Sequence, residues 1–172
     1  MRLLDGEGVL ITGVYGSGKS SVAAEVAYHL EQRGEPYALL DLDYLGWGSS
    51  PGGDQWTEFD MMLRNLAAVG SNYREAGIGL FVVAYFVRGQ PEVRRVGEAL
   101  GVPLRVVRLA VPLAEIERRL AGDVTSGRRD DLRDAASSIA ASEGIGVEDR
   151  VVTNDRPVGV VAREVMAWLG WL

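Results

Sequence analysis

Cysteine is absent from this chain of 172 residues, which excludes disulfide bonds, thiolate zinc sites and cysteine nucleophiles. Histidine occurs once, as His29, so a metal site made of several histidines is excluded as well. A net charge of −6 leaves no general excess of lysine and arginine for binding nucleic acid or an anionic membrane. No apolar run reaches about 18 residues, and the first strand-like segment begins too early to leave room for a signal peptide. The composition therefore predicts a cytoplasmic protein without nucleic-acid or membrane partners.

Lysine also occurs only once. Of the 18 basic residues, 17 are arginine and one is Lys19. Such a bias indicates a chemical requirement at this position, because a planar guanidinium does not replace a compact ammonium between phosphate oxygens. Lys19 lies in Gly13-Val14-Tyr15-Gly16-Ser17-Gly18-Lys19-Ser20, which fits the phosphate-binding pattern G-x-x-x-x-G-K-[ST]. A strand-like segment, residues 8–12, precedes this loop and a helical segment, residues 20–34, follows it, as the pattern requires.

This glycine-rich loop predicts a nucleoside triphosphate site. Its backbone N–H groups and the following helix N-terminus stabilise phosphate charge. We expect Lys19 to contact the β- and γ-phosphates during catalysis, and the Ser20 hydroxyl to bind Mg²⁺. The guanine-specifying Asn-Lys-x-Asp pattern would need a second lysine, so ATP is the expected nucleotide. The loop residues expected to bind it are Gly13, Val14, Tyr15, Gly16, Ser17, Gly18, Lys19, Ser20 and Ser21.

Strand-like and helical segments alternate along the chain, which is typical of a parallel sheet covered on both faces. We expect an α/β protein of one domain, residues 1–172, in which a parallel five-stranded sheet lies between two helical layers. The expected strands are 8–12, 37–43, 78–87, 104–111 and 150–153. The expected helices are 20–34, 54–76, 91–100, 113–120, 134–142 and 158–171. The polar residues 120–133 are interpreted as a small mobile lid.

Two carboxylates, Asp41 and Asp43, end the second expected strand. Ligands of open parallel sheets bind at the carboxyl ends of the strands, and residues two apart on an extended segment share a face. We therefore expect Asp41 to help hold Mg²⁺, and Asp43 to orient the acceptor hydroxyl and take its proton. The alternative is that both residues cap the following turn.

Arginines cluster around the expected lid. Arg119, Arg128 and Arg129 could close over the phosphates, exclude water and stabilise charge on the transferring phosphoryl group. The alternative is a solvated surface on which these arginines pair with neighbouring aspartates. Arg88, directly after the third expected strand, is a further candidate for the substrate pocket.

These segments together resemble the small P-loop kinases, and among them the adenylylsulfate kinase family most closely. Beside the phosphate loop, residues 63–69 and 73–77 resemble the family's helix before the third strand. Residues 81–88 resemble a strand that ends at a substrate-contacting arginine, here Arg88. The resemblance implies the P-loop NTPase fold, a three-layer α/β/α sandwich, with ATP and Mg²⁺ as cofactors.

The resemblance continues towards the end of the chain. Residues 111–113 followed by Arg119 resemble the entry to the family's lid, where an arginine lies against the nucleotide base. Residues 153–157 resemble a turn near the adenine, which implies nucleotide contacts for Asn154, Arg156 and Pro157. The paired aspartates also resemble shikimate kinase, in which one carboxylate is associated with magnesium and the other with the acceptor hydroxyl.

The second strand departs from the family pattern. Adenylylsulfate kinases usually carry Asp-Gly-Asp-Asn followed by an arginine, and this chain carries Asp41-Leu42-Asp43-Tyr44-Leu45-Gly46-Trp47. Their lysine-rich lid is absent too. The acceptor thus stays open between adenylylsulfate, a nucleoside or nucleotide, and an antibiotic-like metabolite. Its pocket is expected among Asp43, Tyr44, Trp47, Arg64 and Arg88.

We therefore expect an ATP-dependent kinase that phosphorylates a hydroxyl group of a small molecule. One alternative is a regulatory P-loop ATPase without a small acceptor, and another is a nucleotide-binding protein that has lost catalysis. Trp168 and Trp171, near one face of the last helix, are interpreted as core residues or as contacts of a possible homodimer.

Overall fold

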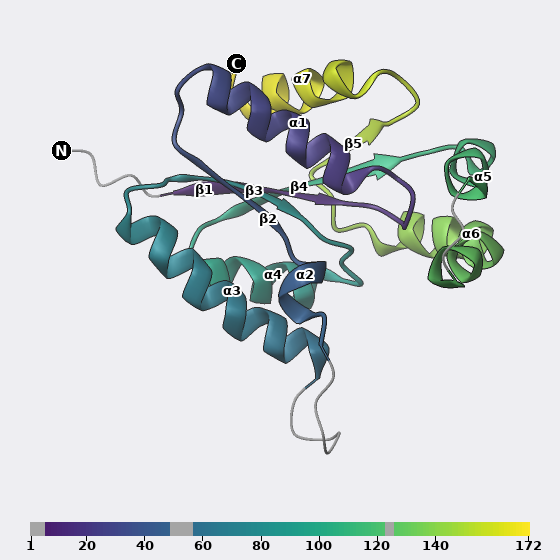
Figure 1. Ribbon diagram of the computed structural model, residues 1–172, viewed down its shortest axis with the longest axis horizontal. Coiled ribbons are helices and arrows are strands. Elements are labelled where there is room, and N and C mark those ends of the chain that lie inside the picture. Colours follow the sequence, from purple (N-terminus) through teal and green to yellow (C-terminus); the bar gives the residue numbers. More distant parts are fainter. Residues whose placement is uncertain (1–5, 49–56, 123–125) are drawn as a thin grey trace.

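The computed structural model describes residues 6–48, 57–122 and 126–172 of the chain. Within them, five strands form one sheet with the order β2-β3-β1-β4-β5 (Figure 1). The elements are β1 (Glu7–Thr12), α1 (Lys19–Gln32), β2 (Tyr37–Asp41), α2 (Asp43–Gly46), α3 (Glu58–Glu75), β3 (Leu80–Ala84), α4 (Gln90–Leu100), β4 (Leu104–Ala110), α5 (Leu113–Ala121), α6 (Ser126–Ile145), β5 (Arg150–Thr153) and α7 (Val158–Leu169).

Every strand pair of this sheet is parallel, which confirms the predicted α/β class. The central strand is β1, where Leu10 lies opposite Val83 of β3 and Val106 of β4. Because all strands run the same way, their carboxyl ends share one edge of the sheet. The phosphate loop follows β1 at this edge, and the two aspartates follow β2.

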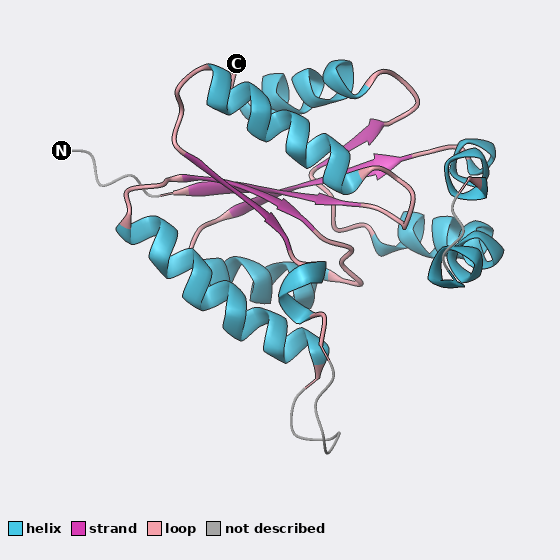
Figure 2. Ribbon diagram, in the orientation of Figure 1, coloured by secondary structure: helices cyan, strands magenta, loops and turns pink. Residues whose placement is uncertain are grey.

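Helices cover both faces of the sheet (Figure 2). The alternation along β1 explains how one strand serves both layers, since successive side chains point to opposite faces. Val9 and Ile11 are buried with residues of α1 and α7, whereas Leu10 is buried with residues of α3 and α4. The resulting α/β/α sandwich is the predicted architecture.

A third cluster of buried residues lies beyond the sheet, where α5 and α6 pack together (Figure 1). Val14 of the phosphate loop is 7% exposed and belongs to this cluster with Ile116 and Leu120 of α5. The phosphate loop is therefore packed against α5 as well as against the sheet.

Several predicted boundaries were wrong at positions that matter for the site. The strand expected over 78–87 ends at Ala84, before Tyr85 and Arg88. Two further boundaries need a physical explanation. The second strand ends at Asp41, not at residue 43, because Leu42 has a helical backbone and α2 begins at Asp43. The Asp41 side chain accepts a hydrogen bond from the Asp43 backbone N–H at 3.3 Å, an arrangement that favours a turn over an extended strand. Both carboxylates nevertheless stay at the same edge of the sheet.

The second boundary concerns the expected lid, residues 120–133. Helix α6 begins at Ser126, eight residues before the predicted start at residue 134. Charged residues three apart share a helix face, and Arg133 pairs with Asp130 at 3.3 Å, so this charged sequence suits a helix. Residues 123–125, in the middle of the expected lid, lie outside the described residues.

The end of the chain folds back onto its beginning. Trp171 is 7% exposed and donates from its indole nitrogen to Glu7 of β1 at 2.9 Å. Arg105 of β4 donates to the same carboxylate at 2.9 Å and lies over the ring of Trp168. Trp171 is therefore a core residue, and Trp168 packs against the same core. Among the described helices, none has the length and apolar character needed to cross a membrane.

Candidate active site

The loop between β1 and α1 places Gly18 at the N-cap of α1 with a left-handed backbone, φ 91° and ψ 23°. This conformation suits glycine, and the lack of a side chain also lets another residue approach closely. A Cβ atom at position 18 would lie 2.5 Å from Nδ2 of Asn154. The glycine is thus required by the backbone conformation and by the contact with Asn154.

Asn154 and Arg119 hydrogen-bond to backbone carbonyl oxygens of the phosphate loop. The buried Asn154 amide donates to the carbonyl oxygen of Ser17 at 2.7 Å. Arg119 of α5 donates to the carbonyl oxygens of Gly16 and Ser17 at 3.2 and 3.3 Å, and to that of Asn154 at 2.6 Å. These bonds join α5, the phosphate loop and the end of β5 into one hydrogen-bonded unit.

Glu115 fixes the remaining side of the Arg119 guanidinium, accepting from its Nε at 2.8 Å. Arg118 bonds to the same carboxylate, and the two arginines together lower the pKa of Glu115 to about 2, with Arg118 the larger cause. Glu115 is consequently ionised at any pH near neutrality. The Arg119 guanidinium is therefore already hydrogen-bonded to the loop carbonyls and to Glu115.

Lys19 begins α1 and donates from Nζ to the carbonyl oxygen of Val14 at 3.1 Å, across the phosphate loop. A cavity of about 270 Å³ opens beside it. Its lining combines backbone N–H groups at a helix N-terminus with one ammonium group, a combination suited to phosphate. The lining residues are Tyr15, Gly16, Gly18, Lys19, Ser20, Ser21, Asp43, Arg119 and Leu120.

Ser20 and Asp41 meet at the edge of this cavity, where the Ser20 hydroxyl donates to a carboxylate oxygen of Asp41 at 2.6 Å. Magnesium prefers oxygen ligands and is usually held by one or two carboxylates together with substrate phosphates. A hydroxyl and a carboxylate side by side next to a phosphate loop therefore fit Mg²⁺. The described residues contain no cluster of three or more acidic, histidine or cysteine side chains, so the phosphates would complete the coordination.

Asp43 lies on the other side of Asp41, at the start of α2. Partial burial raises the pKa of the Asp43 carboxyl, the nearby Asp41 carboxylate raises it further, and the Lys19 ammonium opposes the rise. A carboxylate with a raised pKa is a stronger base. The Asp43 carboxyl thus binds a proton more readily than an ordinary aspartate.

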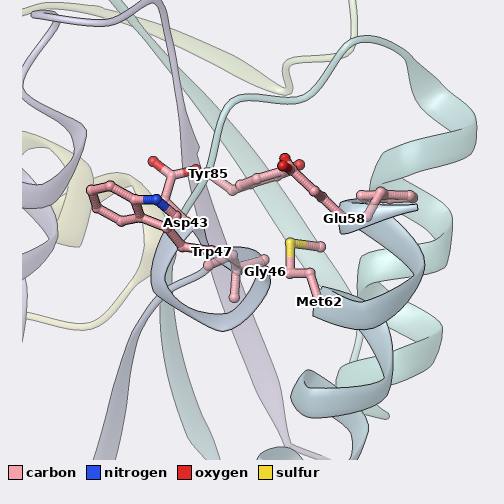
Figure 3. Close-up of a pocket in the computed structure, with 8 residues that line it drawn as sticks. Asp43, Gly46, Trp47, Glu58, Met62 and Tyr85 are labelled. Atoms are coloured by element: carbon pink, nitrogen blue, oxygen red, sulfur yellow. The ribbon is translucent and has the colours of Figure 1, made fainter. Parts of the chain in front are cut away.

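A second cavity, also of about 270 Å³, lies on the α3 side of Asp43. Figure 3 shows Asp43 and Trp47 on one side of it and Glu58 and Met62 of α3 on the other. The lining residues are Leu42, Asp43, Gly46, Trp47, Glu58, Phe59, Met62 and Tyr85. Asp43 therefore borders both this cavity and the cavity at the phosphate loop.

A family model described as adenylylsulphate kinase matches residues 5–124, more than half of the chain. The chain belongs to the adenylylsulphate kinase family. It is 30% identical over 138 residues to an adenylyl-sulfate kinase of Bacteroides fragilis, covering 77% of this chain and 67% of that protein. The resemblance inferred from the sequence is thereby confirmed, and the protein is an ATP-dependent phosphotransferase acting on hydroxyl groups.

Solved kinase structures share the fold of this chain. The Mycobacterium tuberculosis APS kinase, in complex with AMPPNP and APS, is 27% identical with a TM-score of 0.60, over 96% of this chain and 98% of that chain. A shikimate kinase from Acinetobacter baumannii, in complex with shikimate, shares the fold at 16% identity and a TM-score of 0.56, over 94% and 92% of the two chains. ATP and Mg²⁺ are the cofactors of this family.

The sequence predicts acceptor contacts for four further residues, which lie in different surroundings. Trp47 borders the second cavity and is 81% exposed, and Tyr44 is 72% exposed with its ring centroid 6.1 Å from that of Trp47. Arg64 is exposed on α3 and is not part of the cavity lining. Arg88 is 67% exposed, and its guanidinium lies 3.5 Å from the carboxylate of Glu92.

The residues expected to contact the nucleotide or to close over it are likewise spread out. Arg156 donates to Glu164 of α7 at 2.7 Å and to the carbonyl oxygen of Thr153, and Pro157 is the N-cap of α7. Neither is part of the phosphate-side cavity lining. Arg129 is exposed on α6, and the side chain of Arg128 lies outside the described part of the chain.

Sequence reasoning missed Glu58, Phe59, Met62 and Tyr85 as cavity residues. Two signals could have found three of these residues. Phe59 and Met62 are three apart and lie at the first turns of a helix that follows the aspartates, so they face the same side. Tyr85 comes directly after the end of β3, at the ligand-binding edge of the sheet.

Proposed function

We propose that this enzyme phosphorylates a small-molecule acceptor in the cavity formed by α2, α3 and Tyr85, and that Asp43 is the base. The observation that carries this proposal is the position of Asp43, which borders both the phosphate-side cavity and the α3-side cavity. A residue at this junction can touch an acceptor hydroxyl while that hydroxyl faces the γ-phosphate.

The roles of the other residues follow from the same arrangement. The loop N–H groups and Lys19 hold the triphosphate, and Ser20 and Asp41 would hold Mg²⁺ beside it. Mg²⁺ held there would supply positive charge that offsets the negative charge developing during transfer. The acceptor oxygen forms a bond to the γ-phosphorus, the bond from phosphorus to the β–γ bridging oxygen breaks, and the acceptor proton passes to Asp43, leaving ADP and a phosphate ester.

Arg119 has a different role in this proposal from that of a mobile lid arginine. Its donors are bound to Glu115 and to three carbonyl oxygens, so we assign it to holding the loop and to contact with the nucleotide base. Transition-state contacts from Arg128 or Arg129, the lid of residues 120–133, the cytoplasmic location and the homodimer stay predictions.

The test measures turnover with and without acceptors. ADP release reports the rate, and mass spectrometry identifies the product. Acceptor-dependent ADP release with a phosphorylated product supports the proposal. Acceptor-independent release instead points to a regulatory ATPase, and tight ATP binding without turnover points to a protein that has lost catalysis. The α3-side cavity next to Asp43 favours the kinase, because an ATPase needs no second cavity.

A matched pair of variants separates the two aspartates. Asp43→Asn should lower kcat by roughly 10²- to 10⁴-fold, the usual effect of losing a general base, with little change in ATP affinity. Asp41→Asn should instead raise the Mg²⁺ concentration needed for half-maximal turnover. If Asp43→Asn keeps wild-type kcat, Asp43 is not the base.

A further inference from the structure

The charge of the acceptor cavity points to the class of acceptor. Two carboxylates, Asp43 and Glu58, line it, and neither lysine nor arginine is part of its lining in the described chain. Residues 49–56, which are not described and connect α2 to α3 in the sequence, contain no lysine or arginine either. An anionic group that entered this cavity would face two negative charges, and no lysine or arginine of the described lining would offset them.

Two arginines beside residues of the lining have acidic partners. Arg95 lies 2.8 Å from the Asp60 carboxylate, with its guanidinium 5.0 Å from the ring centroid of Phe59. Arg88 lies 3.5 Å from Glu92, which also accepts from the Arg88 backbone N–H at 2.8 Å. An acceptor anion would compete with these carboxylates for either arginine.

The apolar part of the cavity is aromatic. Phe59 and Tyr85 stack with their ring centroids 6.3 Å apart and 18° between their planes. Trp47 stands at the mouth with most of its surface exposed, and the buried side chains of Leu42 and Met62 form the base. Aromatic walls of this kind bind flat or apolar rings, and a small volume favours a ligand of one or two rings.

We propose that the acceptor is a ring-bearing alcohol without an anionic group near its reacting hydroxyl, with the hydroxyl at Asp43 and the ring against Phe59, Tyr85 and Trp47. This inference rests on the proposed kinase function. It places the preferred acceptor of this chain outside the anionic class to which adenylylsulfate belongs.

The test uses matched ligand pairs that share a ring system and differ in charge. The pairs are adenosine against adenosine 5′-phosphate and adenylylsulfate, and phenyl glucoside against phenyl glucuronide. Binding to the full chain, saturated with Mg²⁺ and a non-hydrolysable ATP analogue, is measured by isothermal titration calorimetry. We expect the uncharged member of at least one pair to bind tighter by roughly tenfold or more, since like charges at close range are strongly unfavourable. Tighter or equal binding of the anionic members, or binding of none of these compounds, overturns the inference.

The same compounds are then supplied with ATP, and phosphorylated products are sought by mass spectrometry. This readout separates the two proposals. Transfer that favours the anionic members would overturn the acceptor class and leave the kinase function standing. A binding preference for the uncharged members without any transfer would support the acceptor class and count against the kinase function.

Glu58→Gln tests the electrostatic argument directly. Removing this carboxylate should strengthen binding of the anionic members several-fold relative to the uncharged members. Glu31→Gln, at another exposed glutamate near the far end of α1, is the control for net charge and should leave this ratio unchanged. Trp47→Ala removes an exposed side chain, so the fold should persist while binding of both members weakens. Unchanged discrimination in Glu58→Gln would refute the role of cavity charge.

Discussion

Replacing Gly18 with alanine is the sharpest test of the geometry around the phosphate loop. A left-handed backbone costs an L-residue about 1–2 kcal/mol. The new Cβ would also lie 2.5 Å from Asn154 Nδ2, so the Asn154 side chain must move away from its bond to Ser17. Loss of a buried hydrogen bond of this kind costs about 1–3 kcal/mol. We therefore expect Gly18→Ala to lower the free energy of unfolding by about 2–5 kcal/mol in total.

Gly34→Ala is the matched control. Gly34 also has a left-handed backbone, with φ 70°, but an added Cβ there meets nothing within 4 Å. Only the backbone penalty of about 1–2 kcal/mol should appear. Urea unfolding at equilibrium measures both variants, and thermal unfolding should shift by roughly 2–4 °C for each kcal/mol. The difference between the variants isolates the contact with Asn154.

A double variant completes the test. In an Asn154→Ala background the clash is gone, so Gly18→Ala should cost no more than Gly34→Ala does in the wild type. The two substitutions should thus be non-additive, as expected for residues in direct contact. Equal costs for Gly18→Ala and Gly34→Ala, or strict additivity with Asn154→Ala, would refute the packing of Asn154 over the loop.

Three further predictions concern the charged groups of the site and the end of the chain. Because the pKa of Asp43 is raised in the native state, its bound proton stabilises the fold at low pH, and this stabilisation is lost as the pH rises through the raised pKa. Asp43→Asn should therefore have a higher Tm than the wild type at pH 7. This difference in Tm should shrink below about pH 4, where an ordinary aspartate is protonated, and equal Tm values at every pH would contradict the prediction. Lys19→Ala should lower kcat/KM by roughly 10²- to 10³-fold, since its phosphate contact acts on the transition state, and unchanged turnover would overturn the whole assignment of the loop. Trp171→Phe should cost about 1 kcal/mol through the lost bond to Glu7, seen in urea unfolding, with turnover as the control that stays constant.

The phosphate-side half of the site was predictable because its chemistry depends on local sequence. A strand, a glycine-rich loop, Lys19 and a helix are consecutive in the chain, so their spacing alone determines what they can bind. The parallel sheet was predictable for the same reason, from short apolar segments that alternate with helical ones. The strand order was not, because pairing depends on contacts between distant segments.

The acceptor side was harder to predict because it is assembled from three separate segments. Asp43 was identified, but its place at the start of a helix depends on the Asp41 side chain and on the helical backbone of Leu42. Glu58 and Tyr85 come from α3 and from the end of β3, and only the folded chain brings them to Asp43. Arg88 resembled a substrate contact in the sequence, yet in the structure it precedes α4 and its guanidinium lies 3.5 Å from Glu92 in the first turn of that helix.

The two cavities meet at Asp43 and are otherwise built from different parts of the chain. Natural variation or laboratory selection can therefore remodel the acceptor side without altering the ATP side. A combinatorial library confined to Trp47, Glu58, Phe59, Met62 and Tyr85 would explore new alcohols while phosphoryl donor, metal and base stay constant. One scaffold of this size can in this way give rise to enzymes that share a phosphoryl donor and act on unrelated acceptors.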